Sequence, residues 1–192
     1  ELLPLLSFGF IPFSVDFGIN TDELTWLILS ALPVFAAGLA EDLGYAMSPM
    51  IRLLASAISS LLVIFIFKIW IYELGIPVID TLLMFVPISI IFTVFATVGV
   101  VNAFNLIDGL NGLTSYVTVS IAFALSLIAF QVGSFEIVIF LVLVISAVLG
   151  FMVFNFPFGK IFLGDGGAYM LGHLLVWSAI VLINKAPVIS PF

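Results

Sequence analysis

The sequence predicts an all-α protein, a polytopic bundle of membrane-spanning helices. Of its 192 residues, 64% are hydrophobic and only 8% are charged, and the mean hydropathy is +1.43, far above that of soluble domains. Apolar runs of roughly 17 to 25 residues recur along the chain, the length that a helix needs to cross a bilayer. The alternation of apolar and polar residues that marks a membrane β-barrel is absent from the sequence, so helices are the expected spanning elements.

The first three apolar segments are separated by polar loops. Residues 2–13 look like the tail of one membrane segment and are followed by the loop SVDFGINTDELT. A second segment covers residues 24–40 and stops at the acidic sequence EDLG. Ser48 followed by Pro49 predicts an N-cap and a first helical residue, which would open a third helix over residues 49–72.

Four further segments follow the loop ELGIPVID. They are expected over residues 81–101, 113–130, 135–154 and 168–183, and the sequences NAFNLIDGLNGL, QVGS and NFPFGKIFLGDGG separate them. No internal repeat or domain linker is visible. We therefore expect one membrane domain over residues 1–192 with about six to seven segments. Since no Met begins the chain, we expect a fragment that is incomplete at both ends.

Composition limits the chemistry. The chain has no cysteine, which excludes disulfides and thiolate metal sites. Its net charge is −7, and without basic clusters this argues against a nucleic acid partner. The Lys and Arg residues are divided between the two predicted faces, so the positive-inside rule does not orient the protein.

Three polar loops are predicted to lie on the same side of the membrane. Each crossing moves the chain to the other side, and two crossings separate each of these loops from the next. The loops begin at residues 41, 102 and 155. Four of the eleven carboxylates fall on this face: Glu41, Asp42, Asp108 and Asp165.

The middle loop carries amides at regular spacing. Asn102, Asn105 and Asp108 are three residues apart, so they share one side of the preceding helix if that helix continues. Gly109 and Gly112 let the backbone turn or approach a ligand. A plain connecting loop is the alternative. An Asp at the bilayer centre costs about 2.5 to 3.5 kcal/mol, which favours an interface or a wet functional cavity.

The other two loops also have two interpretations each. Glu41 and Asp42 either mark a helix end at the water boundary, or hold a divalent cation or act as a base. Asp165, boxed by glycines and preceded by Lys160, is either a helix N-cap or a Mg²⁺ ligand beside a phosphate at a helix N-terminus. The glycine spacing excludes a P-loop. His173 is interpreted as a buried hydrogen-bonding group rather than a ligand.

These loops resemble three motifs of the polyprenyl-phosphate N-acetylhexosamine-1-phosphate transferases (glycosyltransferase 4 family). That group also contains the phospho-N-acetylmuramoyl-pentapeptide transferases. The matching sequences are AGLAEDLGYAMSPMIRLL, NAFNLIDGLNGL and FNFPFGKIFLGDGGAYMLG, and the likeness covers about residues 30–190. It implies a protein of about ten or eleven helices. The family's Lys-Pro loop and His-x-His loop are expected beyond the ends of this chain.

The resemblance implies a Mg²⁺-dependent enzyme, with Mn²⁺ as a possible substitute. It would transfer a sugar 1-phosphate, N-acetylhexosamine 1-phosphate, from a UDP-sugar to a polyprenyl phosphate such as undecaprenyl phosphate. UMP would leave, in the first membrane step of cell-envelope glycan synthesis. The implied location is the cell membrane, spanned several times, with the site facing the cytoplasm. Both a monomer and a homodimer are compatible with the sequence.

Residue roles follow from the same resemblance. Catalytic roles are implied for Glu41, Asp42, Asp108 and Asp165, substrate binding for Asn102, Asn105, Asn111, Asn155 and Lys160, and metal binding for Asp165 and Asn105. Glu41 and Asn111 stand where the family often has Asp. The competing function is a secondary transporter or ion channel, which would place such groups near the midplane and often shows paired repeats.

Overall fold

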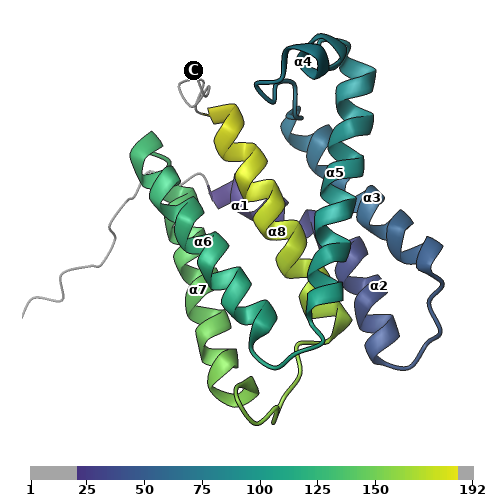
Figure 1. Cartoon of the computed structure of the whole chain (residues 1–192), viewed down its shortest axis with the longest axis vertical. Coiled ribbons are helices and arrows are strands. Elements are labelled where there is room, and N and C mark those ends of the chain that lie inside the picture. The colour runs from purple at the N-terminus through teal and green to yellow at the C-terminus, as the bar shows by residue number, and fades with distance from the viewer. Residues whose placement is uncertain (1–20, 186–192) are drawn as a thin grey trace, which may run out of the picture.

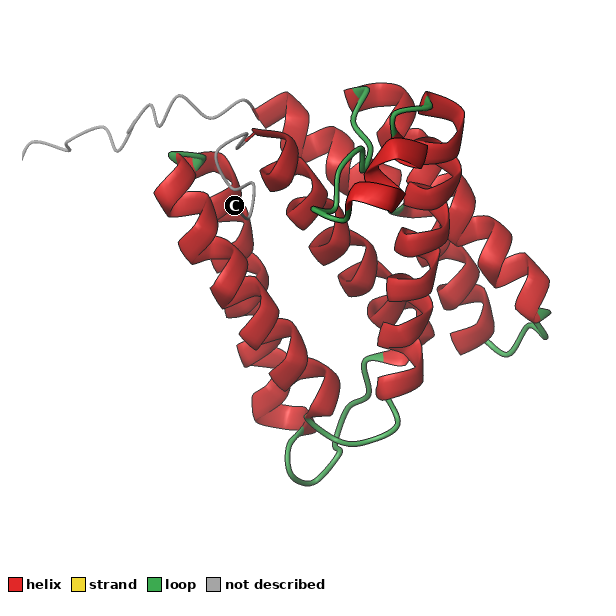
Figure 2. Cartoon of the chain, turned by 45° about the horizontal axis from the view of Figure 1, so that its top comes forward, coloured by secondary structure: helices red, strands yellow, loops and turns green. Residues whose placement is uncertain are grey.

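The computed structural model describes residues 21–185, and within this range it contains eight helices and no strand (Figures 1 and 2). The predicted all-α fold is confirmed. The helices are α1 (Thr21–Ser30), α2 (Leu32–Asp42), α3 (Pro49–Phe67), α4 (Pro77–Leu83), α5 (Val86–Ile107), α6 (Leu113–Val132), α7 (Phe135–Asn155) and α8 (Gly164–Lys185). The segment expected over residues 2–13 lies outside the described residues.

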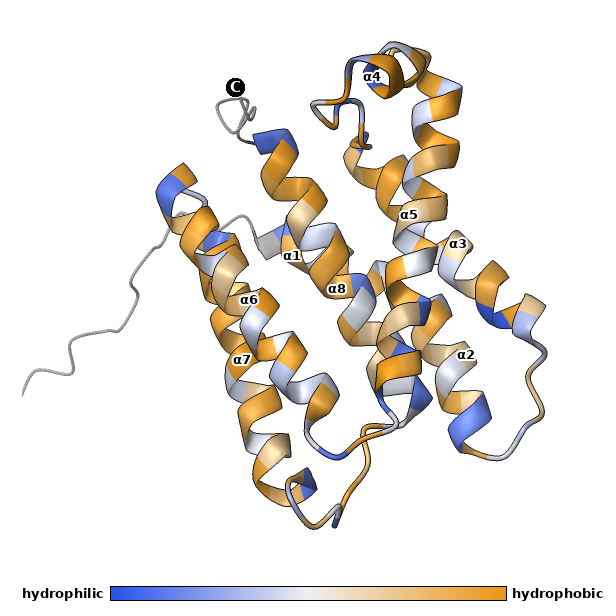
Figure 3. Ribbon diagram, viewed as in Figure 1, coloured by the Kyte–Doolittle hydropathy of each residue, from blue (hydrophilic) through white to orange (hydrophobic). Residues whose placement is uncertain are grey.

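Five helices, α3 and α5 to α8, are long and apolar enough to cross a membrane. The pair α1 and α2 passes the same test as one broken span, bent by 40°, which gives up to six. Six of the predicted segments fall in this part of the chain, so the multi-pass prediction agrees with the structure. Helix α8 is the most buried of the five spans and packs against α2, α5 and α6. Many large apolar side chains of the helices are exposed, and most of the ribbon has the colour of hydrophobic residues (Figure 3).

The predicted second segment is broken in the structure. Pro33 lies at the start of α2 and has no N–H to continue the hydrogen bonds of α1. Ser30 Oγ donates to the carbonyl of Leu27 at 2.6 Å and is itself 3.0 Å from His173 Nε2. His173 is fully buried, as the sequence predicted.

Other helix ends differ from prediction because local backbone geometry decides them. Helix α3 begins as predicted, with Ser48 Oγ accepting from the Ile51 N–H at 3.3 Å. It stops at Phe67 instead of residue 72, because Lys68 adopts a left-handed conformation (φ 57°) that ends the helix. Helix α5 continues six residues beyond the predicted end at residue 101 and therefore includes Asn102 and Asn105. Helix α8 begins at Gly164 instead of residue 168, which puts Asp165 in its first turn.

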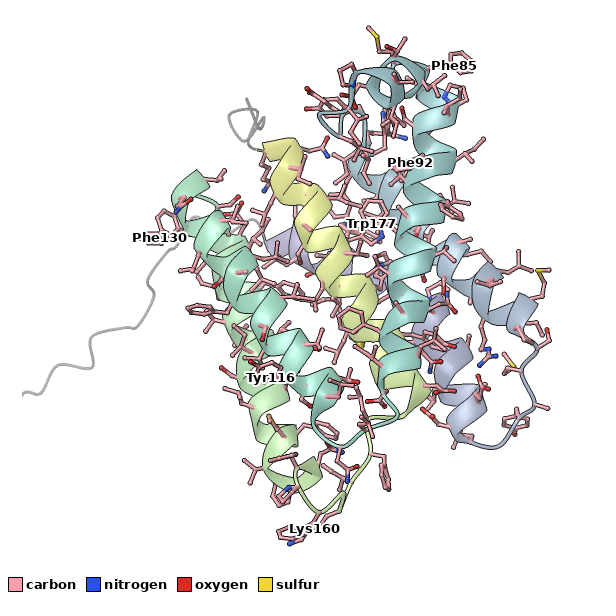
Figure 4. The ribbon with its side chains drawn as sticks, viewed as in Figure 1. Phe85, Phe92, Tyr116, Phe130, Lys160 and Trp177 are labelled. Atoms are coloured by element: carbon pink, nitrogen blue, oxygen red, sulfur yellow. The ribbon has the colours of Figure 1, made fainter. Side chains whose placement is uncertain are left out.

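Small and hydroxylated side chains let the helices approach closely. Ser60 and Thr97 form a hydrogen bond of 2.8 Å between α3 and α5. The backbone N–H of Val34 in α2 donates to Ser59 Oγ of α3 at 3.1 Å. Such residues are typical of helix contacts in membranes, where close packing replaces the hydrophobic effect. Trp177, fully buried on α8, fills the middle of the core (Figure 4).

Polar residues gather at the two ends of the bundle (Figure 3). At one end, Lys185 pairs with Glu23 at 3.0 Å and with Glu136 at 2.8 Å, joining α8 to α1 and α7. The loops after α2, α5 and α7 all lie at the other end, toward the bottom of the view in Figure 1. The three loops thus lie at one end of the bundle, in agreement with the count of crossings, and we call this end the motif end.

Candidate active site

The motif end is built on a close crossing of α2 and α8. A Cβ added to Gly38 of α2 would lie 2.5 Å from the backbone nitrogen of Gly166 and 2.6 Å from the carbonyl carbon of Asp165. Only glycine allows the two backbones to come this near. The crossing brings the last turn of α2 onto the first turn of α8, although about 120 residues separate them along the chain.

Asp42, the last residue of α2, caps the N-terminus of α8. Its Oδ1 accepts from the Asp165 N–H at 2.8 Å and its Oδ2 accepts from the Gly166 N–H at 3.0 Å. A carboxylate at this place satisfies helix N–H groups that have no partner in the helix and also complements the helix dipole. Gly164 precedes them with φ 73°, and a Cβ there would lie 2.6 Å from Asp42 Oδ2.

This contact changes the interpretation of Asp165. One sequence alternative made Asp165 a simple N-cap, but the structure gives the capping role to Asp42. The functional alternative placed a phosphate on the N–H groups of α8, and Asp42 occupies two of those groups instead. The side chain of Asp165 is consequently free of a capping role and turns toward α5.

The side chain of Asp165 forms a hydrogen bond with Asn105 of α5. Asn105 Nδ2 donates to Asp165 Oδ1 at 2.5 Å, a contact between residues 60 apart in sequence. This bond orients the carboxylate and leaves the carbonyl oxygen of Asn105 as a donor atom for a cation. The extension of α5 beyond residue 101 is what places Asn105 here.

Asp108 lies just after the end of α5 and is partly buried. Burial raises the pKa of its carboxyl above the ordinary value of 3.8, and the negative charges of Asp165 and Asp42 add to the rise, while the Thr114 hydroxyl opposes it. Asp42, Asp108 and Asp165 thus come close enough for their charges to interact.

A pH dependence follows from Asp108. Its raised pKa means that the folded protein binds the proton more tightly than the unfolded chain does. The resulting contribution to stability is complete below pH 3.8 and is lost as pH rises through the folded-state pKa. In detergent melting experiments without divalent cations, the stability of wild type relative to Asp108→Asn should therefore fall as pH rises from 3.8. A difference that stays constant with pH would contradict this expectation.

Glu41 forms an ion pair with Arg52, a residue that the sequence motifs did not indicate as part of the site. Arg52, in the first turn of α3, donates from Nη1 to both carboxylate oxygens of Glu41 at 3.2 Å. Both side chains are partly buried, with 24% and 29% exposed. Arg52 also interacts with Tyr169 and with the charge of Asp165. The spacing of eleven residues across a loop gave no sequence signal for this pair.

Asn155 and Asn111 connect two loops of the motif end. The buried Asn155 accepts from the Gly112 N–H at 2.6 Å and donates to the Ile161 carbonyl at 2.9 Å. Asn111 is exposed and donates to the Pro157 carbonyl at 3.3 Å. These amides join the α5–α6 loop to the α7–α8 loop, and substrate binding by them stays a prediction.

Replacement by Asp should change stability differently at Asn155 and at Asn111. In Asn155→Asp, a carboxylate replaces the N–H donor beside the Ile161 carbonyl, in a buried position. We expect a loss of about 2 kcal/mol in stability. Asn111→Asp is the matched control, since its amide is exposed and makes one long bond, and it should melt within about 0.5 kcal/mol of wild type. Equal melting temperatures for the two variants would argue against a stabilising role of the Asn155 hydrogen bonds between the loops.

The remaining predicted residues lie apart from this cluster. Asn102 donates from Nδ2 to the Val98 carbonyl of its own helix at 2.8 Å. Lys160 is exposed at the tip of the α7–α8 loop (Figure 4). Their substrate-binding roles stay predictions.

The donor set suits a hard cation that shares its coordination with a substrate. Within residues 21–185, no three Asp, Glu or His side chains gather into a group that could hold a metal by itself. Mg²⁺ is usually bound by one or two carboxylates together with substrate phosphates and water. Asp165 with Asn105 offers one carboxylate and one amide oxygen side by side, which fits that pattern.

Comparisons with known proteins agree with the motifs. The model of the family described as Glycosyl transferase family 4 matches residues 24–183. The phospho-N-acetylmuramoyl-pentapeptide-transferase of Bacillus subtilis (strain 168) is 46% identical over 92 residues, which cover 47% of this chain and 28% of that protein. The protein of the same name from Anoxybacillus flavithermus is 44% identical over 93 residues, covering 48% and 28%.

A third relative of that name, from Streptococcus agalactiae serotype III, is 41% identical over 91 residues, covering 47% of this chain and 27% of its own. The aligned stretch is thus little more than a quarter of each curated relative. The family model spans most of the chain, including all three motifs of the motif end. The chain therefore belongs to glycosyl transferase family 4.

Proposed function

We propose that the full-length protein transfers a sugar 1-phosphate, N-acetylhexosamine 1-phosphate, from a UDP-sugar to a polyprenyl phosphate and releases UMP. An oxygen of the lipid phosphate attacks the β-phosphorus of the UDP-sugar. The bond from that phosphorus to the bridging oxygen breaks, and the electron pair leaves with UMP. This reaction serves as the first membrane step of cell-envelope glycan synthesis.

One observation supports the proposal most strongly. Asp42, Asn105 and Asp165 come from three distant motifs and are joined by hydrogen bonds at one end of a membrane bundle. There a water-soluble nucleotide sugar and a membrane lipid can meet. Phosphoryl transfer depends mainly on positioning and on stabilising charge, which a rigid cluster of this kind can supply.

Each part of the cluster has a proposed task. Asp165 and Asn105 would hold Mg²⁺ or Mn²⁺, which when bound neutralises the pyrophosphate oxygens and the leaving group. Asp42 fixes the first turn of α8 and thereby the direction of Asp165. Asp108, whose pKa is raised chiefly by burial, would bind a proton more readily than an exposed carboxyl does and is proposed as the base.

Four other polar residues of the motif end are assigned to the nucleotide sugar, which donates the sugar 1-phosphate. Asn102, Asn111, Asn155 and Lys160 are proposed to bind the nucleotide sugar, with Asn155 also holding the loops in register. Because a nucleotide sugar is charged and does not cross a bilayer, we propose that the motif end faces the cytoplasm. A homodimer is compatible with this arrangement.

The decisive experiment uses the full-length protein in lipid vesicles. UMP release is measured with undecaprenyl phosphate as acceptor and with UDP-N-acetylglucosamine or UDP-N-acetylmuramoyl-pentapeptide as donor, before and after addition of EDTA. The second donor is included because of the names of the curated relatives. Release that needs both the lipid and the cation supports the proposal. No release with either donor counts against it.

A transporter or channel is the alternative, and the broken α1–α2 span with its buried Ser30 and His173 is the observation that favours it. Transporters place their ion ligands at such breaks. In this structure the carboxylates lie instead at the end of the bundle. Ion or solute flux through vesicles, without any UMP release, would favour this alternative.

A further inference from the structure

Two polar atoms of α8 lie in the buried core and have no hydrogen-bond partner among residues 21–185: His173 Nδ1 and Trp177 Nε1. Both side chains are fully buried, and they lie one helical turn apart on the same face of α8. Nearly all buried polar groups in proteins are hydrogen-bonded, because an unpaired group has lost its water without compensation. Two such atoms on neighbouring rings therefore point to a small polar ligand.

The Ser30 hydroxyl decides which nitrogen of His173 carries the hydrogen. Ser30 has one hydroxyl hydrogen and donates it to the Leu27 carbonyl at 2.6 Å. In its 3.0 Å contact with His173 Nε2, Ser30 Oγ must therefore accept, so Nε2 carries the hydrogen. The ring is neutral, because a charge in the fully buried core would be very costly. Nδ1 of His173 is thus a bare acceptor, whereas the indole N–H of Trp177 can only donate.

The α1–α2 break lies beside this pair because α2 and α8 pack antiparallel with a regular register. Contacts recur about every four residues along both helices. They join Asp42 to Asp165, Gly38 to Gly166, Val34 to Tyr169 within one buried cluster, and Ser30 to His173. One further turn brings Leu27 of α1 opposite Trp177, and both side chains belong to the same buried apolar cluster.

The break also leaves a backbone carbonyl available at this place. The N–H of Ala31 donates to the carbonyl of Ile28 at 3.1 Å, three residues back, instead of to Leu27 as in a continuous α-helix. The Leu27 carbonyl, which accepts from Ser30 Oγ, therefore keeps a second lone pair for another donor. Ordered water is one of the groups that satisfy backbone atoms freed at proline breaks in membrane helices.

We propose that one water molecule is bound between His173, Trp177 and the Leu27 carbonyl. The water accepts from the Trp177 indole N–H and donates its two hydrogens to His173 Nδ1 and to the Leu27 carbonyl. Three hydrogen bonds are typical of a buried water. The centroids of the two rings are 6.4 Å apart and the rings are inclined by 52°, so they are not stacked, which is compatible with a single bridging water. The water would tie α8 to α1 at the break.

The polar atoms at this site identify water rather than an ion. A cation would face the N–H of Trp177, which can only donate, and an anion would face two acceptors, His173 Nδ1 and the Leu27 carbonyl. A small neutral molecule that both accepts and donates is complementary to all three. The site therefore accounts for the polar groups of the broken span without the transported ion of the alternative function. It does not rest on the proposed reaction, since His173 lies eight residues, about two turns, beyond Asp165 on α8.

Solid-state NMR of the full-length protein in bilayers, with ¹⁵N-labelled histidine and tryptophan, tests the site. The signals of the two residues are assigned by their loss in His173→Phe and Trp177→Phe. We expect the wild-type His173 ring to carry its hydrogen on Nε2, and we expect magnetisation to pass from a water proton to both His173 Nδ1 and the Trp177 N–H. A hydrogen on Nδ1, no transfer from water to these nitrogens, or a direct coupling between them would overturn the inference.

The contribution of the indole N–H is tested by substitution. Trp177→Phe keeps an aromatic ring but removes the donor, so most of the water transfer to His173 Nδ1 should be lost. Trp26→Phe is the matched control, because Trp26 is 51% exposed on α1, and it should leave the transfer unchanged. Full transfer in Trp177→Phe would mean that Trp177 does not hold the water, and the proposed site would be wrong.

A structure of the full-length protein in which ordered water is visible gives a second measurement without any variant. A water peak within hydrogen-bond distance of His173 Nδ1, Trp177 Nε1 and the Leu27 carbonyl oxygen supports the inference. Direct contact between the two nitrogens, or density for an ion or a larger molecule, overturns it. Neither measurement uses UMP release, so the failure of this site and the failure of the proposed function are distinguished.

Discussion

Replacing Asp165 by Asn is expected to lower kcat for UMP release by about a thousandfold or more while the protein still folds. A bound cation stabilises transition-state charge by several kcal/mol, and the amide of Asn is a weak substitute for the only carboxylate that Asn105 orients in this way within residues 21–185. The fold should survive because Asp42 bonds to the backbone N–H of residue 165, which the substitution retains.

The measurement needs a second readout and a control. Binding of Mn²⁺ to the purified protein, followed by electron paramagnetic resonance, should weaken about ten- to a hundredfold in Asp165→Asn. Asp22→Asn removes an exposed carboxylate at the opposite end of the bundle and should change neither Mn²⁺ binding nor turnover. If Asp165→Asn kept the wild-type rate, both the metal assignment and the proposed catalytic role would be wrong.

Sequence patterns predicted the parts of this protein that depend on the bilayer. Length and hydropathy placed the spanning helices, and counting crossings brought the loops of Asp42, Asn105 and Asp165 to one end. The pair Ser48 and Pro49 gave the start of α3, because capping is a local interaction. Helix ends set by one unusual backbone conformation, such as the left-handed Lys68, had no comparable signal.

The finer geometry of the site depends on tertiary contacts that no local pattern encodes. Asp42 was predicted to be catalytic, and its bonds to the first turn of α8 join residues more than 120 positions apart. The pairing of Arg52 with Glu41 crosses a loop of irregular structure, so the spacing rules for helices do not apply to it. Pro33 was the available signal for the break between α1 and α2, since a proline at that position removes a helix hydrogen bond. The catalytic and binding roles themselves stay predictions until variants are assayed.

Gly38→Ala tests whether the α2–α8 crossing controls the site. The added Cβ would lie 2.5 Å from the nitrogen and 2.6 Å from the Cα of Gly166, and both are backbone atoms that cannot rotate away. Helix α2 must shift, so Asp42 loses its bonds to α8 and Asp165 loses its direction. We expect a loss of about 1 to 3 kcal/mol in stability from overpacking and a fall of about a hundredfold in kcat, since a displacement of about 1 Å can cost that much.

Gly99→Ala makes the same chemical change where the space is open. Gly99 is exposed on α5, and nothing lies within 4 Å of its added Cβ. Alanine is the better helix former, so this variant should be as stable as wild type or more stable by about 0.5 to 1 kcal/mol, with full activity. Melting in detergent and UMP release in vesicles, measured on both variants, separate a specific crossing from a general sensitivity to added methyl groups. If Gly38→Ala kept the stability and rate of wild type, the helices would tolerate a separation that breaks the cap by Asp42. The close approach of α2 to α8 would then not be what positions Asp42 and Asp165.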